Sequence, residues 1–244
     1  MIRAGNEDNF FADTNGPRGL FVVADGMGGH AAGEVASEMA VHILTRELLQ
    51  AASFDEARAT ECVAEALRRA NVAIYQRTAE EVEKQGMGTT ASVLFLLGAR
   101  YVIGQVGDSR VYLLRDGRLR QLTKDHSYVQ EQVDAGRLTV EQARYHPYSN
   151  VITRCVGASP AVEPDVYEGE VQAGDVFLVA SDGLTGMVDD RRLQQLLLSR
   201  ATPARVVDAL IAEANGRGGL DNITAVVVQV NTVDDDDHGE RAGK

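Results

Sequence analysis

Cysteine is scarce and tryptophan is absent from the 244 residues of the sequence. The two cysteines, Cys62 and Cys155, form no CxxC pair, which excludes a disulfide framework and a thiol-based zinc site. Both lie among apolar residues, and we expect them to be free thiols in the core of a protein from a reducing compartment.

Long apolar runs and a surplus of basic residues are also missing. The longest strongly apolar run spans residues 93–97, whereas a membrane-spanning helix needs about 20 apolar residues. No basic and then apolar N-terminal segment suggests a signal peptide. The formal net charge of -12 disfavours nucleic acid as a partner, because phosphate backbones bind basic surfaces. We expect a cytoplasmic protein that binds neither membranes nor nucleic acids.

Two pairs of helices are indicated by apolar residues at helical spacing. The first pair covers residues 36–48 and 63–82, and the second pair covers residues 189–197 and 203–216. The dipeptide Thr202-Pro203 fits the N-cap and first position of the last helix.

Short runs rich in β-branched and apolar residues indicate strands. The predicted strands are 90–97, 101–106, 111–114, 176–180 and 223–230. We expect the first three to form an antiparallel meander, with a tight turn at Asp116-Gly117. The polar stretch 124–157 is expected to hold short helices and a mobile segment.

The order of these elements favours the α+β class over a doubly wound parallel sheet, because the helices do not alternate singly with the strands. Antiparallel sheets with helices packed outside fit this order. No solenoid repeat is present. We expect one domain over residues 1–231 and an acidic, disordered tail over residues 232–244, which contains the run DDDD.

Acidic residues recur where apolar strands end, next to glycine or another small residue. A single Asp-Gly pair is ordinarily a turn, but carboxylates clustered at neighbouring strand ends raise one another's pKa unless a cation lies among them. Oxygen ligands alone favour a hard ion such as Mg²⁺ or Mn²⁺, and adjacent glycines let carbonyls and waters approach it. The acids concerned are Glu7, Asp8, Asp25, Asp108, Asp182 and Asp221.

The segment GMGGHA, residues 26–31, also fits the GxGxxG/A pattern of dinucleotide-binding sites. Against this, a second helix rather than a strand follows the first helix, and Asp25 would face the pyrophosphate. The acid about 20 residues further on, Glu47, lies within a predicted helix instead of at a strand end. A dinucleotide site is therefore disfavoured, and no GxxxxGK[ST] sequence indicates a P-loop.

Seven motifs in a fixed order carry a family resemblance. They are RAGNEDNF, VVADGMGGHAAGEVAS, GMGTTASVLFL, GQVGDSRVYLLRDGRLRQLTKDHSYV, HPYSNVITRCVG, FLVASDGLTGMV and GLDNITAVVV. From Arg3 to about Val230 the sequence resembles the PP2C (PPM) metal-dependent protein serine/threonine phosphatases of the bacterial type. The resemblance implies an α-β-β-α sandwich of two antiparallel sheets flanked by helix pairs. It also implies hydrolysis of phosphoserine and phosphothreonine by direct attack of a hydroxide that bridges two metal ions.

The resemblance assigns roles to most of the recurring acids. Asp25 would bridge two Mn²⁺ or Mg²⁺ ions, and Asp182 and Asp221 would complete one metal site. The carbonyl of Gly26 would serve the other site, with the pair Glu7-Asp8 acting near it through water.

A third ion, a phosphate ligand and a general acid are also implied. Asp108 would hold a weaker, third ion together with Asp182, and Arg3 would bind the substrate phosphate, because a guanidinium pairs with two phosphate oxygens. The chain has Met27 where the eukaryotic pattern has a histidine. The nearest histidine, His30, is the candidate general acid; alternatively, it only lines the site and a metal-bound water donates the proton.

Other features receive structural interpretations. Arg3 lies close to the start of the sequence, whereas the family usually has a strand before this arginine. His126 is expected at the start of a helix, with a neighbouring residue as its cap, and Ser109 is expected to be a turn hydroxyl rather than a nucleophile. Residues 136–155 match the segment that the family uses as a flap.

The main functional hypothesis is a metal-dependent phosphoprotein phosphatase. Two alternatives are a catalytically silent sensor or binding module of the same fold and a metal-dependent hydrolase of small phosphate esters. The expected partners are phosphorylated proteins, by analogy with the family a bacterial serine/threonine kinase and its substrates. We expect the protein to be a monomer.

Overall fold

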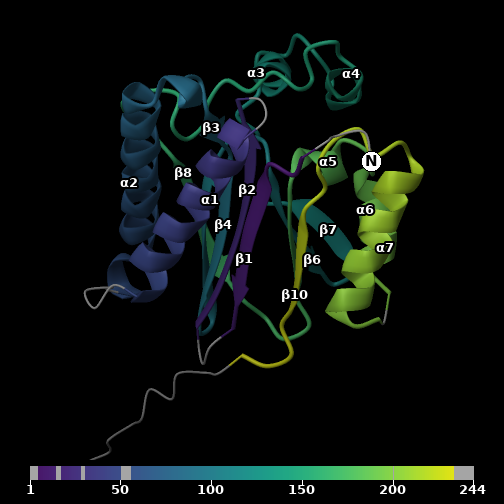
Figure 1. Ribbon diagram of the computed structural model, residues 1–244. Coiled ribbons are helices and arrows are strands. Elements are labelled where there is room, and N and C mark those ends of the chain that lie inside the picture. Colours follow the sequence, from purple (N-terminus) through teal and green to yellow (C-terminus); the bar gives the residue numbers. More distant parts are fainter. Residues whose placement is uncertain (1–4, 15–17, 29–30, 51–55, 200, 234–244) are drawn as a thin grey trace, which may run out of the picture.

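Two antiparallel sheets face each other, and a pair of long helices covers each outer face (Figure 1). The computed structural model describes residues 5–14, 18–28, 31–50, 56–199 and 201–233. The layers follow the order helices, sheet, sheet, helices, which confirms the predicted α-β-β-α sandwich. None of the helices in these ranges is long and apolar enough to cross a membrane.

The first sheet contains six strands and is covered by α1 and α2. Its long strands run in the order β1-β2-β4-β5-β8, and the short β3 pairs with β2. The bounds are β1 Asp8–Asp13, β2 Arg18–Met27, β3 Gly88–Thr89, β4 Ala91–Leu97, β5 Arg100–Val106 and β8 Asp165–Glu170. The covering helices are α1 Ala31–Thr45, extended by a π-helical turn at Arg46–Gln50, and α2 Ala59–Glu80, with 3₁₀ turns at Glu56–Arg58 and Val82–Lys84. Strand β8 was not predicted, because this half-exposed edge strand has a polar sequence, DVYEGE.

The second sheet contains four strands in the order β10-β9-β6-β7 and is covered by α6 and α7. Its bounds are β6 Arg110–Arg115, β7 Arg118–Gln121, β9 Val176–Ala180 and β10 Ala225–Gln229, and the helices are α6 Asp190–Leu197 and α7 Pro203–Gly216. Leu193 and Val206 lie among the buried residues between this sheet and its helices, as the helical spacing predicts. The turn between β6 and β7 is also confirmed, because Asp116 and Gly117 both have positive φ.

The predicted meander is wrong at one point. Strands β4 and β5 are antiparallel neighbours, but β6 belongs to the opposite sheet, where it pairs with β7 and β9. The chain crosses between the sheets at Gly107, Asp108 and Ser109. Gly107 has a φ of 102°, a conformation that side chains disfavour. A hairpin and a crossover of this kind contain the same turn residues, so the sequence pattern does not separate them.

A segment with two short helices stands over the end of the sandwich (Figure 1). These helices are α3 Tyr128–Asp134 and α4 Val140–Arg144. Ser127 caps α3 by accepting a hydrogen bond from the Gln130 N–H, which confirms that His126 precedes a helix start. We call residues 128–151 the flap.

The two cysteines are free thiols, as expected, but neither belongs to the core. Cys62 and Cys155 are both half-buried. The apolar residues around each cysteine in the sequence led us to expect more burial than the structure shows for these side chains.

Candidate functional site

Five acidic residues gather at one end of the sandwich, on segments from both sheets. Asp8 opens β1 and lies directly opposite Asp25, near the end of β2. Asp182 follows β9 as the first residue of the short helix α5, Asp182–Thr185, and Asp221 precedes the neighbouring strand β10. Asp108 lies on the crossover from β5 to β6. Asp25 interacts electrostatically with Asp8, Asp108 and Asp182, and Asp182 interacts with Asp221, so the strand-end acids form one cluster.

Hydroxyl groups of the second sheet hold Asp8 in place. Its Oδ2 accepts hydrogen bonds from Ser181 Oγ at 2.8 Å and from Thr224 Oγ1 at 2.7 Å. Ser181 Oγ in turn accepts a hydrogen bond from the Thr224 N–H at 3.0 Å. These bonds join the start of β1 to the segments that carry Asp182 and Asp221.

The carboxyl groups also contact one another. Asp25 lies within hydrogen-bonding reach of both Asp8 and Asp182. Within the described part of the chain, no three His, Cys, Asp or Glu side chains already face one common point as the ligands of a single ion.

Burial perturbs the charges of this cluster. It raises the pKa of Asp25 well above its ordinary value, and the charges of Asp8, Asp182 and Asp108 raise it further. Burial likewise raises the pKa of Asp108 well above its ordinary value, with Asp182 as the largest charged contributor. The pKa values of Asp8 and Asp182 are also raised, chiefly by burial. Each carboxylate therefore lacks enough positive charge around it at neutral pH.

Three buried carboxylate oxygens have no hydrogen-bond partner in the described chain. They are Oδ1 of Asp8, of Asp108 and of Asp182. A buried oxygen without a partner is costly, and a hard divalent cation is the group that carboxylate oxygens accept most readily. The residues of the cluster therefore fit the metal ions that the sequence predicts.

Two glycines next to the acids are required by close backbone contacts. A Cβ on Gly26 would lie 2.1 Å from the Gly33 carbonyl oxygen, and a Cβ on Gly183 would lie 1.8 Å from the Asn222 carbonyl oxygen. These separations leave no room for any side chain. The glycines thus bring other backbone segments against the acid-bearing segments.

The backbone of Glu7 lies beside Gly26. Its carbonyl accepts hydrogen bonds from the Gly26 N–H at 3.1 Å and from Ser37 Oγ at 2.6 Å. Its N–H donates to Asn222 Oδ1 at 3.0 Å, and the Asn222 side chain also donates to the Gly5 carbonyl at 2.9 Å. Asn222 therefore ties the N-terminal acids to the loop that carries Asp221.

Two threonines hold the backbone of Asp25. The Asp25 N–H donates to Thr90 Oγ1 at 2.9 Å, and the Asp25 carbonyl accepts from Thr89 Oγ1 at 3.0 Å. We did not predict these threonines, or Ser181, Thr224 and Asn222, as site residues. The available signal was their position inside the motifs GMGTTASV, FLVASDGL and GLDNITAV.

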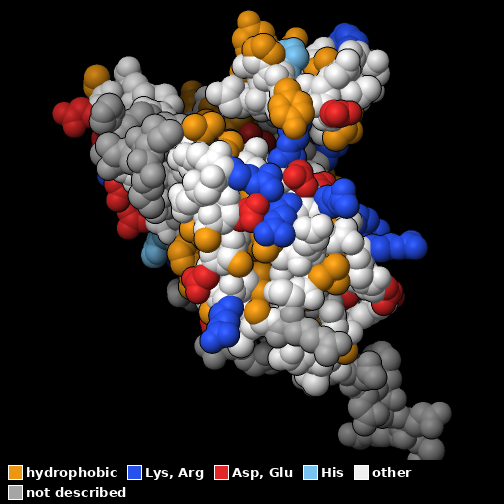
Figure 2. All heavy atoms as spheres, turned by 90° about the vertical axis from the view of Figure 1, so that its right-hand side faces the viewer, with side chains coloured by type: hydrophobic (Ala, Val, Ile, Leu, Met, Phe, Trp, Pro, Cys, Tyr) orange, Lys and Arg blue, Asp and Glu red, His pale blue; other side chains and the backbone are white. Residues whose placement is uncertain are grey.

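A cleft separates the acids from the flap. It has a volume of about 510 Å³, and its walls include Asp108, Asp182 and Asp221 on one side and Val129 and Arg144 of the flap on the other. In the space-filling view the flap overhangs this hollow (Figure 2). The flap therefore forms one wall of the cleft that leads to these three acids.

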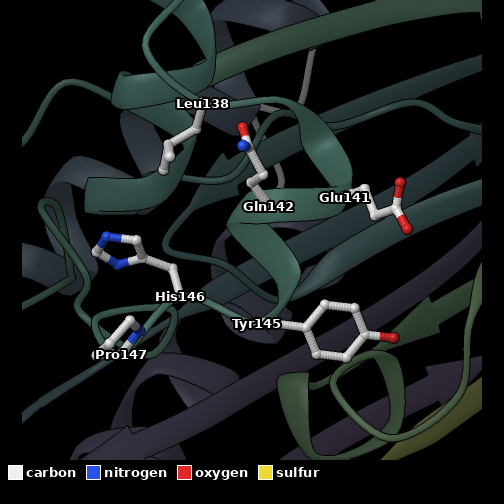
Figure 3. A pocket seen from close by; sticks show the side chains of 6 residues that line it. All are labelled: Leu138, Glu141, Gln142, Tyr145, His146 and Pro147. Carbon is white, nitrogen blue, oxygen red and sulfur yellow. The ribbon is translucent and has the colours of Figure 1, made fainter.

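A second, shallower hollow lies within the flap itself. Leu138 and His146 line one side of it, and Glu141 and Tyr145 line the other (Figure 3). No residue of the acid cluster borders this hollow, so it is separate from the candidate site.

The two predicted catalytic residues, Arg3 and His30, lie outside the described residues. Ser109 lies on the crossover beside Asp108, as expected, and its hydroxyl forms a hydrogen bond of 2.7 Å with Thr90 Oγ1. His126 is buried and accepts a hydrogen bond from the Gly107 N–H at its Nδ1.

Known proteins match this chain over most of its length. The sequence profile of Protein phosphatase 2C matches residues 3–213. The serine/threonine phosphatase stp of Listeria monocytogenes is 40% identical over 232 residues, which make up 93% of this chain and 91% of the relative.

Solved structures share the fold as well. The crystal structure of the Mycobacterium tuberculosis serine/threonine phosphatase PstP/Ppp superposes with a TM-score of 0.86 at 39% identity, over 95% of each chain. The catalytic domain of PstP in complex with two manganese ions gives a TM-score of 0.84 at 38% identity, over 95% of this chain and 94% of that chain. The chain belongs to the protein phosphatase 2C family.

Proposed function

We propose that this protein is a serine/threonine phosphatase that hydrolyses phosphoserine and phosphothreonine esters in proteins with the help of two bound Mn²⁺ or Mg²⁺ ions. One observation carries the proposal: at the end of a PP2C sandwich, buried carboxylate oxygens of Asp8, Asp108 and Asp182 have no hydrogen-bond partner among the described residues. The named phosphatases among the relatives support it, and the structure of PstP with two manganese ions supports the choice of metal.

The acids divide into ligand groups in this proposal. Asp25 would hold both ions, Asp182 and Asp221 would complete one site, and the Gly26 carbonyl would serve the other, with Glu7-Asp8 beside it. Asp108 and Asp182 hold a third, weaker ion. When bound, two divalent ions lower the pKa of a water molecule and stabilise the charge of an in-line displacement at phosphorus.

The chain itself orients these groups and the substrate. Ser181 and Thr224 hold one oxygen of Asp8, which leaves the other oxygen free for an ion. Thr90 accepts a hydrogen bond from the Asp25 N–H, and Thr89 donates one to the Asp25 carbonyl, so both backbone polar groups of Asp25 are held. Arg3 would bind the phosphate, a role that the resemblance implies. His30 is the candidate general acid because it is the histidine nearest to Met27, where the eukaryotic pattern has a histidine; in the alternative, His30 only lines the site and a metal-bound water donates the proton.

The cleft beneath the flap fits a phosphorylated segment of a protein. It lies between the acids and the flap, and it carries both acidic and apolar residues. Four expectations stay predictions: a kinase partner, a monomeric state, a cytoplasmic location and a domain that spans residues 1–231.

The test is hydrolysis of a phosphothreonine peptide and of a sugar phosphate, each with and without Mn²⁺. Turnover of the peptide that requires Mn²⁺ and exceeds turnover of the sugar phosphate is expected. Preference for the sugar phosphate would favour a hydrolase of small esters. A folded protein that binds Mn²⁺ but hydrolyses neither compound would favour the silent module.

A further inference from the structure

The loop that carries Asp108 is held by a buried amide. Gln105, at the end of β5, donates hydrogen bonds from its Nε2 to the Gly107 carbonyl at 3.0 Å and to the Ser109 carbonyl at 2.7 Å. These two carbonyls flank Asp108 in the sequence. One side-chain amide thus fixes the backbone on both sides of the acid.

A second side chain sets the orientation of that amide. Ser92 lies directly opposite Gln105 in the sheet, and its hydroxyl donates to Gln105 Oε1 at 2.6 Å. The amide nitrogen is therefore directed at the loop, because the reverse orientation would place Oε1 against two carbonyl oxygens. Both side chains are completely buried.

Packing alone does not explain this polar pair. Leu94 and Ile103 lie two residues along the same strands and belong to the apolar core between the sheets. A buried amide and hydroxyl are costly unless they are fully hydrogen-bonded. The positions of its partners explain the pair: the Gln105 amide forms its hydrogen bonds with Ser92 and with the two loop carbonyls. The pair therefore stabilises the loop rather than the packing of the core.

The loop is also linked to Asp25. Ser109 Oγ and Thr90 Oγ1 are 2.7 Å apart, and Thr90 Oγ1 accepts the Asp25 N–H. A continuous set of hydrogen bonds, buried except for the partly buried last one, therefore runs from Gln105 through Ser109 and Thr90 to Asp25. It joins two acids that lie on different parts of the sandwich.

We propose that Gln105, oriented by Ser92, is a positioning residue that fixes the Asp108 carboxylate and thereby sets the affinity of the divalent-ion step that depends on Asp108. The inference rests on the proposed function. Replacing a residue that orients a metal ligand through hydrogen bonds typically lowers metal affinity by about 10–100-fold.

The test is calorimetric titration of the metal-stripped protein with Mn²⁺. Asp108→Asn identifies the binding step that depends on Asp108, and Asp25→Asn identifies the step that depends on Asp25. Gln105→Met keeps a similar volume but removes both donors, and we expect it to weaken the Asp108 step by about 10-fold or more and the Asp25 step by clearly less, because Gln105 reaches Asp25 only through Ser109 and Thr90. Ser92→Ala keeps the amide but not its orienting hydroxyl, and a smaller loss at the same step is expected.

Matched variants separate positioning from folding. Gln229→Met makes the same change on β10, where the amide contacts only the Ala201 carbonyl at 3.4 Å among the described residues, and it should leave both steps unchanged. The double variant Ser92→Ala/Gln105→Met leaves no unpaired hydroxyl and provides a folded protein if Gln105→Met alone unfolds.

Three results would overturn the proposal. In folded Gln105→Met or double-variant protein, an unchanged Asp108 step, or equal weakening of both steps, would show that the amide is only structural. If the isotherm of Asp108→Asn equalled that of the wild type, no Mn²⁺-binding step would depend on Asp108, and the proposal would lose its basis. Absence of Mn²⁺-dependent peptide hydrolysis in the wild type would instead count against the proposed function, because these isotherms do not depend on turnover.

Discussion

At the scale of single residues, the site is a set of carboxylates placed where apolar strands end. Asp25 and Asp108 have pKa values raised well above the ordinary value, first by burial and then by neighbouring acids. Such side chains make the folded, metal-free protein less stable at neutral pH than at acid pH, because they ionise at a lower pH in the unfolded chain than in the folded chain.

The pH dependence of stability tests this crowding. A carboxyl group whose pKa is higher in the folded than in the unfolded chain stabilises the fold fully below its unfolded value of 3.8, and that stability is lost as the pH rises through the folded pKa. In a chelator, Asp25→Asn should therefore be more stable than the wild type at pH ~8, with a smaller advantage at pH ~5. Urea unfolding at both pH values measures this difference.

A control of opposite sign is available in the flap. Lys124 lowers the pKa of Asp134, so Asp134→Asn should show no stabilisation at the higher pH. If Asp25→Asn were less stable than the wild type at both pH values in chelator, the account of crowded charges would be wrong.

The close backbone contact at Gly26 gives a second prediction for a single residue. In Gly26→Ala the new methyl group would lie 2.1 Å from the Gly33 carbonyl oxygen, and overpacking of this kind typically costs about 1–3 kcal/mol or more. We expect a lower free energy of unfolding and a loss of Mn²⁺ binding. Gly216→Ala is the control, because among the described residues no atom beyond its chain neighbours and its own helix backbone lies within 4 Å of the added Cβ; equal stability of the two variants would contradict the prediction.

At the scale of elements, ion pairs of very different burial join the strands. Asp175, which is 1% exposed, accepts hydrogen bonds from Arg115 at 2.7 and 2.6 Å. By contrast, Arg100 and Glu168 form a largely exposed pair at 3.5 Å. Removing one partner of a buried pair leaves an uncompensated charge, whereas exposed pairs contribute little.

These two pairs predict different costs for the same substitution. Arg115→Ala should lower the free energy of unfolding by about 3–5 kcal/mol, because the carboxylate of Asp175 would stay buried without its cation. Arg100→Ala should lower it by at most about 1 kcal/mol. Denaturant unfolding of both variants measures the difference, and similar values would show that the burial of Asp175 has been misjudged.

The elements also show where sequence patterns suffice. Helical spacing predicted both helix pairs, because each packs one apolar face on a sheet. The pattern failed at Gly107, since a glycine after a strand is compatible with a hairpin and with a crossover to another sheet. It also failed at β8, where an edge strand needs no apolar run.

At the scale of the whole molecule, the site is assembled from segments far apart in the sequence. The acids could be predicted because each lies at the start or the end of an apolar strand and the motif order is that of the family. Their supports could not: Ser181 and Thr224 meet Asp8 only after the two sheets pack. Sequence separations of 173 and 216 residues leave no local signal for these contacts.

In the proposed function, this cluster of acids binds the divalent ions on which phosphatase activity depends. The most direct test measures Mn²⁺ binding and phosphothreonine-peptide turnover in the same preparations of wild type and Asp25→Asn. We predict that the wild type binds at least two ions per chain and turns over only when they are bound. The folded variant should lose an ion, and its turnover should fall by about 100-fold or more, since bound metal supplies several kcal/mol of transition-state stabilisation. Full turnover in Asp25→Asn, or in wild type without a divalent ion, would contradict the account.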